Sequence, residues 1–398
     1  MRIDIVSTGL SPDNLTQEGQ RIIAASDLLI GPAQLIGIHA AKGQPRLTTS
    51  RPDEVIDAIH TSQASRIAVL MPGDVGLHAE ATKIASRLRK NHPDAEVRLI
   101  PGISAVAMLA TRVGVPWQDA CLVSCHSSTV DLVAPVRRHR YTIALTGENV
   151  HKLAISLSDA RYGGLRVWAG QNLGLEDESI IHDTVSGLAE RDWSPLTTLV
   201  IENREFDDRV LAGLPDDRFI RGDVPMTTSA VRAVSMARLA VRPTDVCYDI
   251  GCGTGSVTVE LALAAHAGHV YSLDKELAAV LLTEQNCRTF HLGNVTALQG
   301  KAPDALADWP APDIAFVGGT SGSMRSIVET LVARNPAVRL VIATLTIENT
   351  ATAIEAMKKA GLTPQVTQLN VADGQVAGGL HLFAAQNPIT IIAGGADD

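Results

Sequence analysis

The stretch Asp249-Ile250-Gly251-Cys252-Gly253-Thr254-Gly255-Ser256 decides the fold of the second half of the chain. It follows an apolar segment, residues 246–250, that predicts a strand, and it precedes a helical pattern over residues 257–265. Three glycines at this position permit a tight turn, and the first turn of the helix offers free N–H groups to a ligand. The pattern therefore predicts a ligand-binding turn between a strand and a helix of an α/β domain.

The glycine spacing distinguishes between two nucleoside cofactors. A dinucleotide fingerprint would place its third glycine at position 256, which is serine here. Asp274 ends the next predicted strand, where its carboxylate could accept hydrogen bonds from both hydroxyls of a ribose. The spacing favours S-adenosylmethionine over NAD, although NAD remains consistent in principle. A plain turn for the glycines and a helix N-cap for Asp274 are the structural alternatives.

Two further loops follow predicted strands in the same half. One reads Gly300-Lys301-Ala302-Pro303-Asp304 and the other Val317-Gly318-Gly319-Thr320. Because ligands of open α/β sheets bind at the carboxyl ends of the strands, we expect these loops to meet the glycine turn. The predicted cofactor-binding residues from this reasoning are Asp249, Gly251, Gly253, Gly255, Asp274, Gly300, Ala302, Gly318 and Gly319.

Short apolar segments alternate with helical patterns along the whole chain, which predicts an α/β protein with mainly parallel sheets. A charged segment rich in glycine and proline, residues 204–224, separates two dissimilar halves and predicts a linker and an arm. We therefore expect domains at 1–203 and 225–398. The expected strands are residues 3–7, 66–70, 96–100, 120–124, 141–145, 166–169, 197–201, 246–250, 269–273, 295–298, 314–317, 339–343, 364–369 and 380–384.

Composition excludes several classes of protein. The 398 residues are 45% hydrophobic and 19% charged, which is typical of globular domains and not of disordered chains. Five cysteines without a C-x-x-C pair predict neither a disulfide framework nor a zinc site, and no metal is expected. With no signal pattern and no long apolar run, we expect a soluble cytoplasmic protein. The net charge of −9 disfavours a nucleic-acid partner.

The second half resembles a known family. The motifs Pro225-Met226-Thr227, Val231-Arg232, Asp249 to Ser256, Gly300 to Pro303 and Asn387-Pro388 match in order the cobalamin-pathway methylases that act on C15 of the corrin precursor and decarboxylate its C12 acetate arm. The resemblance implies a Rossmann-like class I methyltransferase domain and adds Thr227 to the cofactor residues. The family's usual Lys-x-Glu is replaced by Thr228-Ser229-Ala230, so no role of those residues is carried over. We expect Asn387-Pro388 to follow the last strands.

The first half resembles a different family. Glycine-bearing turns follow three of its predicted strands at Gly9, Gly73 and Gly102. Each alone is consistent with a simple strand-to-helix turn, but together they resemble the tetrapyrrole methylase fold of two α/β lobes, and most closely its C5 methylases. Ser11 and Asp13 depart from the family's usual first loop. The residues that the resemblance places around a second S-adenosylmethionine are Leu10, Asp74, Leu77, Ser104, Ala105, Leu145 and Thr146.

The two resemblances together imply a bifunctional enzyme with one S-adenosylmethionine site per domain. It would methylate precorrin-6B (precorrin-6Y) at C5 and C15 and decarboxylate the C12 acetate, which gives precorrin-8. Whether that substrate already contains cobalt stays open. Transfer of a sulfonium methyl depends chiefly on positioning, and the conjugated macrocycle would accept the electrons released with CO2. No catalytic acid or base is assigned, and His126 is more typical of a structural histidine.

The resemblance implies a tetrapyrrole polycarboxylate as substrate. Arg232 and Arg238 are candidate partners for its carboxylates, because the net negative charge of the chain would otherwise repel them. Both families imply a homo-oligomer. A methyltransferase acting on RNA or protein is one alternative, and a tetrapyrrole carrier without turnover is another. The lack of a basic stripe with aromatic residues disfavours RNA, and two intact cofactor loops disfavour the carrier.

Overall fold

The computed structural model describes residues 1–77, 79–125, 131–208 and 212–395, and the chain divides into two compact units. Unit 1 comprises Met1–Val130, Arg140–Lys152 and Leu165–Asn203, and unit 2 comprises Asp131–His139, Leu153–Gly164 and Arg204–Asp398. Among the described residues, every helix is too short or too polar to span a bilayer.

The first sheet of unit 1 is fully parallel, with the strand order β3-β2-β4-β1-β5. Apolar side chains of its strands and helices form the core, including Ile3, Ile5, Ile59 and Leu88. The carboxyl ends of β4, β1 and β5 are adjacent, so the three glycine turns that follow them lie together. The bounds are β1 (Arg2–Ser7), α1 (Gln17–Ala25), β2 (Leu28–Gly31), α2 (Ala33–His39), β3 (Arg46–Thr48), α3 (Pro52–Thr61), β4 (Arg66–Met71), α4 (Ala79–Asn91) and β5 (Glu96–Ile100).

The second sheet of unit 1 has the order β6-β7-β10-β8-β9 and contains both parallel and antiparallel pairs. Only β6 and β7 pair in parallel, and the other neighbours are antiparallel. The physical reason is connection length, because the short link between β8 and β9 cannot hold the crossover that parallel pairing needs. The bounds are α5 (Ala105–Arg112), β6 (Cys121–Ser124), α6 (Val133–Arg138), β7 (Tyr141–Leu145), α7 (Val150–Asp159), β8 (Arg166–Gln171), β9 (Ser179–Thr184) and β10 (Thr197–Glu202).

Unit 2 contains a seven-stranded sheet with the order β13-β12-β11-β14-β15-β19-β16. The strands from β13 to β15 are parallel, whereas β19 runs antiparallel to both β15 and β16. The bounds are α8 (Ser229–Leu239), β11 (Val246–Ile250), α9 (Ser256–Ala264), β12 (His269–Asp274), α10 (Leu277–Thr289), β13 (Val295–Gln299), β14 (Ile314–Val317), α11 (Met324–Arg334), β15 (Arg339–Thr344), α12 (Ile347–Lys359), β16 (Gln365–Leu369), β17 (Ala372–Ala377), β18 (Leu380–Ala385) and β19 (Ile389–Gly394).

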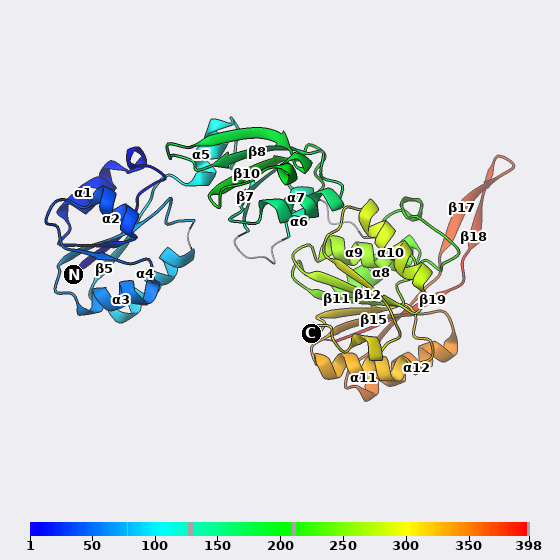
Figure 1. Ribbon diagram of the computed structural model, residues 1–398. Coiled ribbons are helices and arrows are strands. Elements are labelled where there is room, and N and C mark those ends of the chain that lie inside the picture. Colours follow the sequence, from blue (N-terminus) through cyan, green and yellow to red (C-terminus); the bar gives the residue numbers. More distant parts are fainter. Residues whose placement is uncertain (78, 126–130, 209–211, 396–398) are drawn as a thin grey trace. The chain divides into compact units, whose positions relative to one another are not determined.

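The strand order of unit 2 creates a switch point between β11 and β14. The chain moves outward from β11 to β12 and β13 and then returns to the other side of β11. Helices α11 and α12 pack on one face of the sheet and α8, α9 and α10 on the other, as Figure 1 shows. In such sheets, the crevice at the carboxyl ends of the strands beside the switch point is where ligands bind.

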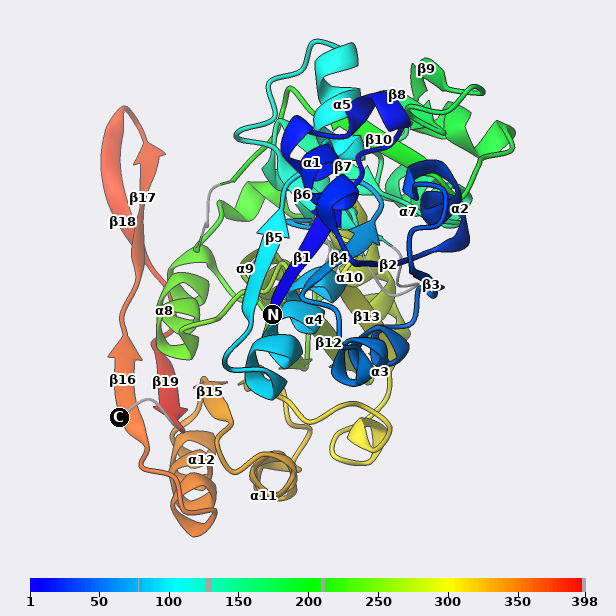
Figure 2. The ribbon, with the colours of Figure 1, turned by 90° about the vertical axis from the view of Figure 1, so that its left-hand side faces the viewer.

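A two-stranded hairpin, β17 and β18, extends from the edge of unit 2 beyond β16 and β19 (Figures 1 and 2). Its apolar side chains are solvent-exposed, with Val376 at 72% and Phe383 at 83% exposure. The strands β2, β3, β9, β17 and β19 were not among the expected ones. Because β19 begins at Ile389, the expectation that Asn387-Pro388 follows the last strands was wrong.

Candidate functional site

Two loops meet at the switch point of unit 2. The amides of Gly318 and Gly319 donate to the carbonyl of Ile250, at 2.9 and 3.2 Å. Gly251 has a φ of +80°, and a Cβ at this position would lie 2.5 Å from the amide nitrogen of Gly319. Only glycine allows both the left-handed backbone and this close approach. Glycine at position 251 is therefore required for the two loops to pack.

Asp274 lies opposite the glycine turn, at the end of β12. Its Oδ2 accepts a hydrogen bond from the amide of Gly253 at 3.1 Å, and its Oδ1 accepts one from the amide of Glu276 at 3.0 Å. These contacts orient the carboxylate along the edge of the sheet. Each oxygen retains a second lone pair, so the group can still accept hydrogen bonds from a ligand diol.

A cavity of about 820 Å³ opens between these loops. That volume lies within the range of roughly 300–1,000 Å³ typical of ligand sites. Of the residues predicted from the sequence, those that line the cavity are Thr227, Gly251, Gly253, Asp274, Gly300, Ala302, Gly318 and Gly319. A nucleoside ligand with an amino-acid tail, such as S-adenosylmethionine, fits this combination of glycine amides, a carboxylate and a cavity of this size.

The charged residues of this cavity lie on one side of it. Its charged lining residues come from the segment before α8 and from the loops after β12 and β13, namely Asp223, Asp274, Lys275, Glu276 and Lys301. The opposite side, after β14 and β15 and before β19, contributes only uncharged side chains among the described residues. The polar ones are Thr320, Ser321, Thr344, Gln386 and Asn387. The cavity thus has a charged side suited to the cofactor and a neutral polar side.

Asp249 and Gly255 belong to the predicted set but do not line the cavity. Gly255 caps the start of α9. Asp249 is fully buried beneath the turn, where its Oδ2 accepts a hydrogen bond from the Thr258 hydroxyl at 2.5 Å. Burial raises the pKa of Asp249 to about 7, and the nearby Asp274 adds to the rise. This carboxyl therefore gains a proton on folding at pH values between 4 and 7.

The raised pKa predicts how stability depends on pH. Between pH 4 and 7 the folded chain holds a proton on Asp249 that the unfolded chain does not, so the free energy of unfolding falls as pH rises across this window. We expect Asp249→Asn to remove this slope. The free energy of unfolding is measured with denaturant at pH 5 and at pH 7.5. Its decrease between these two pH values should be smaller in the variant than in the unchanged chain, by about 1–3 kcal/mol. Equal losses in both proteins would contradict the assignment.

Unit 1 contains a second, smaller cavity of about 290 Å³ where the three glycine turns meet. Gly9 and Gly73 exchange backbone hydrogen bonds at 3.2 and 2.8 Å, which joins two of these turns. Asp74 accepts a hydrogen bond from the amide of Gly76 at 2.7 Å, and Ser104 caps α5. The predicted residues that line the cavity are Leu10, Asp74, Leu77, Ser104, Ala105 and Leu145.

Thr146 is the one predicted residue of unit 1 that does not line the cavity. It is fully buried, and its hydroxyl donates to the carbonyl of Thr197 at 2.8 Å. Sequence reasoning missed Gln34 and His39, which reach the cavity from α2. Burial lowers the pKa of His39, which favours its neutral form. Neither residue lies in a recognisable motif, so neither could be predicted from the sequence.

The structure corrects the suggestion that Arg232 binds substrate carboxylates. Its side chain is 0% exposed and pairs with the equally buried Glu260 at 2.7 Å. Arg238 lies on the surface near Gln365 and Thr367, and it does not line the cavity. His126 lies outside the described residues. Within the described residues, no group of three histidine, cysteine or acidic side chains is placed to hold a metal.

The fold and the two cavities define a class of protein: an α/β enzyme with a Rossmann-like methyltransferase domain and a second, two-lobed α/β domain. A model described as tetrapyrrole (corrin/porphyrin) methylases matches residues 2–189, and one described as precorrin methyltransferase domain matches residues 218–394. The chain belongs to the precorrin methyltransferase family. These matches confirm the expected fold class and the assignment as a methyltransferase, and methyltransferases of this family use S-adenosylmethionine.

Two relatives illustrate this membership. A precorrin-6Y C(5,15)-methyltransferase [decarboxylating] from Sinorhizobium sp is 27% identical over 388 residues, covering 94% of this chain and 92% of the relative. A probable cobalt-precorrin-6B C(15)-methyltransferase (decarboxylating) from Pyrobaculum calidifontis is 40% identical over 183 residues, 45% of this chain and 94% of the relative. The crystal structure of a Geobacter metallireducens precorrin-6y C5,15-methyltransferase aligns with a TM-score of 0.45 and 28% identity, over 47% of this chain and 98% of that one.

Proposed function

We propose that this chain methylates precorrin-6Y at C5 and C15 and decarboxylates its C12 acetate arm in cobalamin biosynthesis, giving precorrin-8. The observation that carries the proposal is the Sinorhizobium relative, which is named for both methylations and the decarboxylation and aligns along 94% of this chain. The presence of one cavity in each unit supports it, because two methyl transfers are required.

We assign C5 methylation to residues 1–203 and C15 methylation with decarboxylation to residues 225–398, joined by the segment 204–224. The family matches support this division, since the tetrapyrrole methylase match ends at residue 189 and the precorrin methyltransferase match begins at 218. The Pyrobaculum relative also supports it, because a protein named only for the C15 step spans less than half of this chain. Each domain then holds its own S-adenosylmethionine.

When bound, S-adenosylmethionine supplies a methyl group that its sulfonium charge already activates. The residues of unit 2 therefore hold and align rather than exchange protons. The Asp274 carboxylate would accept hydrogen bonds from the ribose hydroxyls, and the amides of the glycine turn would meet the polar tail. In unit 1, the turns around Leu10, Asp74 and Ser104 would hold the second donor molecule.

The neutral side of the large cavity suits the decarboxylation. Thr344, Gln386 and Asn387 can donate hydrogen bonds to the substrate's carboxylates, and none of the described residues that line this side is charged. A carboxylate with few charged partners is less stabilised than one in water, which favours release of CO2 while the electron pair of the broken C–C bond moves into the conjugated macrocycle. The remaining methylene then takes up a proton to become a methyl group, and no residue is assigned to that step.

Product mass spectrometry tests the proposal. The purified chain is incubated with S-adenosylmethionine and metal-free precorrin-6Y, with the cobalt-containing form as a second arm. We expect two methyl gains and one CO2 loss, with C15 methylation and CO2 loss both strongly reduced in Gly251→Ala, where a Cβ would collide with the loop after β14. A parallel assay follows labelled methyl groups into bulk RNA, where we expect none. Labelled RNA, or no mass change with either tetrapyrrole, would overturn the proposal.

The proposal includes self-association, and the hairpin β17–β18 supports it. Its exposed apolar side chains, Val376, Leu380, Leu382 and Phe383, are costly to leave in water. We expect a second copy of the chain to cover them, so that Phe383→Asp shifts the protein to a smaller species. Sedimentation velocity measures the shift, with the exposed Leu196→Asp in unit 1 as the control. A wild-type monomer would contradict the expectation.

A further inference from the structure

The segment 213–228, here called the arm, contains η3 (Asp216–Arg218) and leads past the large cavity to the start of α8. Its last six residues, 223–228, line that cavity. Its carbonyl at Pro225 lies so close to the glycine turn that a Cβ on Gly253 would be 2.5 Å from it. The arm is therefore a wall of the cofactor cavity and rests directly on the turn.

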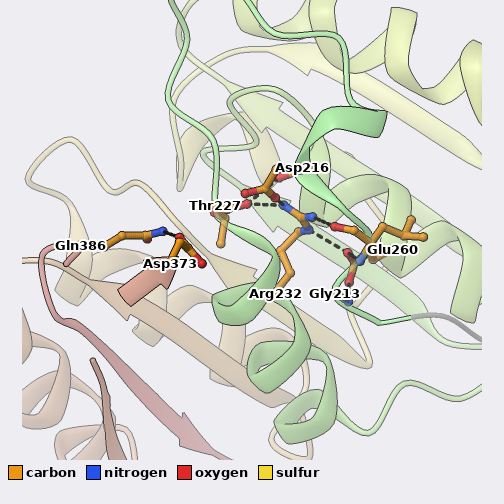
Figure 3. Close-up of polar contacts among 9 residues, drawn as sticks. Gly213, Asp216, Thr227, Arg232, Glu260, Asp373 and Gln386 are labelled. Atoms are coloured by element: carbon orange, nitrogen blue, oxygen red, sulfur yellow. Dashed lines mark hydrogen bonds and ion pairs between the residues drawn. The ribbon is translucent and has the colours of Figure 1, made fainter. Parts of the chain in front are cut away.

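A buried ion pair fastens the beginning of the arm. The carboxylate of Glu260, on α9, accepts hydrogen bonds from the amides of Gly213 and Leu214, each at 2.9 Å. Arg232, on α8, donates to the same carboxylate at 2.7 Å, and both side chains are 0% exposed (Figure 3). A single arginine–glutamate pair thus joins α8, α9 and the first residues of the arm.

The same arginine also reaches the end of the arm that borders the cavity. Its guanidinium donates to the carbonyl of Leu214 at the start of the arm and to the carbonyl of Thr227 near the end. It also pairs with Asp216 at 2.9 Å (Figure 3). The guanidinium lies over the ring of Phe219, 4.6 Å from its centroid. The planar guanidinium has five donors in a fixed geometry, which is why one side chain can hold both ends.

A second contact ties the middle of the arm to the turn. The buried Asn286 exchanges hydrogen bonds with the backbone of Ile220, at 2.8 and 3.0 Å, and donates to the carbonyl of Thr254 at 2.8 Å. The arm is therefore held relative to the glycine turn at its beginning, middle and end. None of these anchoring side chains lines the cavity.

From this geometry we propose that Arg232 is a positioning residue for the methyl-donor site of unit 2. Arg232 holds the arm in position, and its contact with the carbonyl of Thr227 fixes the shape of the cavity wall. It does so without touching the cofactor itself. The inference rests on the proposed function, because it assumes that S-adenosylmethionine occupies this cavity. It predicts that loss of Arg232 weakens cofactor binding in unit 2 more than the loss of stability explains.

The test separates positioning from stability. Arg232→Met leaves the buried Glu260 carboxylate without its cationic partner, which destabilises the fold. Arg232→Met/Glu260→Gln removes both charges and keeps an acceptor for the amides of the arm, so it should recover much of that stability. The matched control is Arg339→Met, which breaks the buried pair with Asp245 at 2.5 Å in the same unit, away from the cavity. Arg232→Lys keeps the charge but cannot reach both carbonyls, so we expect an intermediate effect.

Binding is read by photolabelling the full-length chain with [methyl-³H]S-adenosylmethionine at increasing concentrations, followed by proteolysis and counting of peptides from residues 204–398. We expect half-saturation to rise by at least about tenfold in Arg232→Met and in the double variant, a change equivalent to roughly 1.4 kcal/mol. It should stay at the wild-type value in Arg339→Met, and peptides from residues 1–203 should label equally in all variants.

Wild-type half-saturation in the double variant, or an equal rise in Arg339→Met, would overturn the positioning role and leave the proposed function intact. Absence of label in peptides 204–398 of the unchanged chain would overturn the cofactor site of unit 2 and this inference with it. The two failures are therefore distinct, and neither readout depends on the tetrapyrrole substrate.

Discussion

Replacing Gly251 with alanine should reduce C15 methylation and CO2 release by at least about 100-fold, the loss typical of a misplacement of about 1 Å at a reacting centre. The added Cβ would stand 2.5 Å from the Gly319 amide nitrogen and 2.7 Å from its Cα. Both neighbours are backbone atoms at the end of β14, so neither can rotate away. One of the two cofactor loops must move.

Gly322→Ala is the matched control for this variant. Gly322 has a similar φ of +85° but nothing within 4 Å of the position of its Cβ. Alanine at position 322 would have the same left-handed backbone strain as alanine at position 251, but its Cβ would collide with nothing. We therefore expect Gly322→Ala to form as much product as the unchanged chain. Both are measured by mass spectrometry of the product, where the C5 methyl gain should persist in Gly251→Ala. Unchanged CO2 release in Gly251→Ala would contradict the role of the loop contact.

Asp274→Ala should weaken S-adenosylmethionine binding in unit 2 by at least about 100-fold. The variant would lose the two charge-assisted hydrogen bonds that we propose Asp274 makes to the ribose, each contributing roughly 1.5–3 kcal/mol. It also frees the Gly253 amide, which Asp274 holds at 3.1 Å. Because binding rather than chemistry is lost, we expect the KM for S-adenosylmethionine to rise and kcat at saturation to change little.

The control for Asp274→Ala is Glu284→Ala. Glu284 is a partly exposed carboxylate on α10 that pairs with Arg288 at 3.8 Å and does not line the cavity. We expect its KM for S-adenosylmethionine, measured by CO2 release, to match that of the unchanged chain. A normal KM in Asp274→Ala would mean that the carboxylate serves only as a cap for the turn and for Glu276.

The parts of the molecule that could be predicted from sequence are those with local signals. The strands β5, β7, β11 and β14 were predicted with the bounds that they have. β7, β11 and β14 are short, mostly apolar segments bordered by polar or glycine residues, and β5 ends directly before Pro101. The glycine turn and Asp274 were found because their spacing reflects a backbone requirement. The residue assignments at the two sites remain predictions until variants such as these are measured.

The parts that could not be predicted depend on contacts between distant segments. β19 is an apolar strand inserted between β15 and β16, and only sheet pairing reveals its antiparallel direction. Arg232 carries a charge, which suggested a surface or a substrate, yet Glu260 lies 28 residues away and on another helix. Burial of such a pair follows from how α8 and α9 pack, and no local pattern encodes it.

The pairing of β16 with β19 has a consequence for how this enzyme can vary. Leu369 and Ile389 are direct partners in the register of these strands, so everything between them is an enlarged hairpin loop. Residues 370–388 could therefore be exchanged for a tight turn without disturbing the order of the sheet. This segment contains Gln386 and Asn387, which line the cavity, and at its tip the hairpin β17–β18 with its exposed apolar side chains. Replacing this one segment would thus change both the access to the neutral side of the cavity and the proposed association between copies of the chain. The fold of the methyltransferase domain would stay the same.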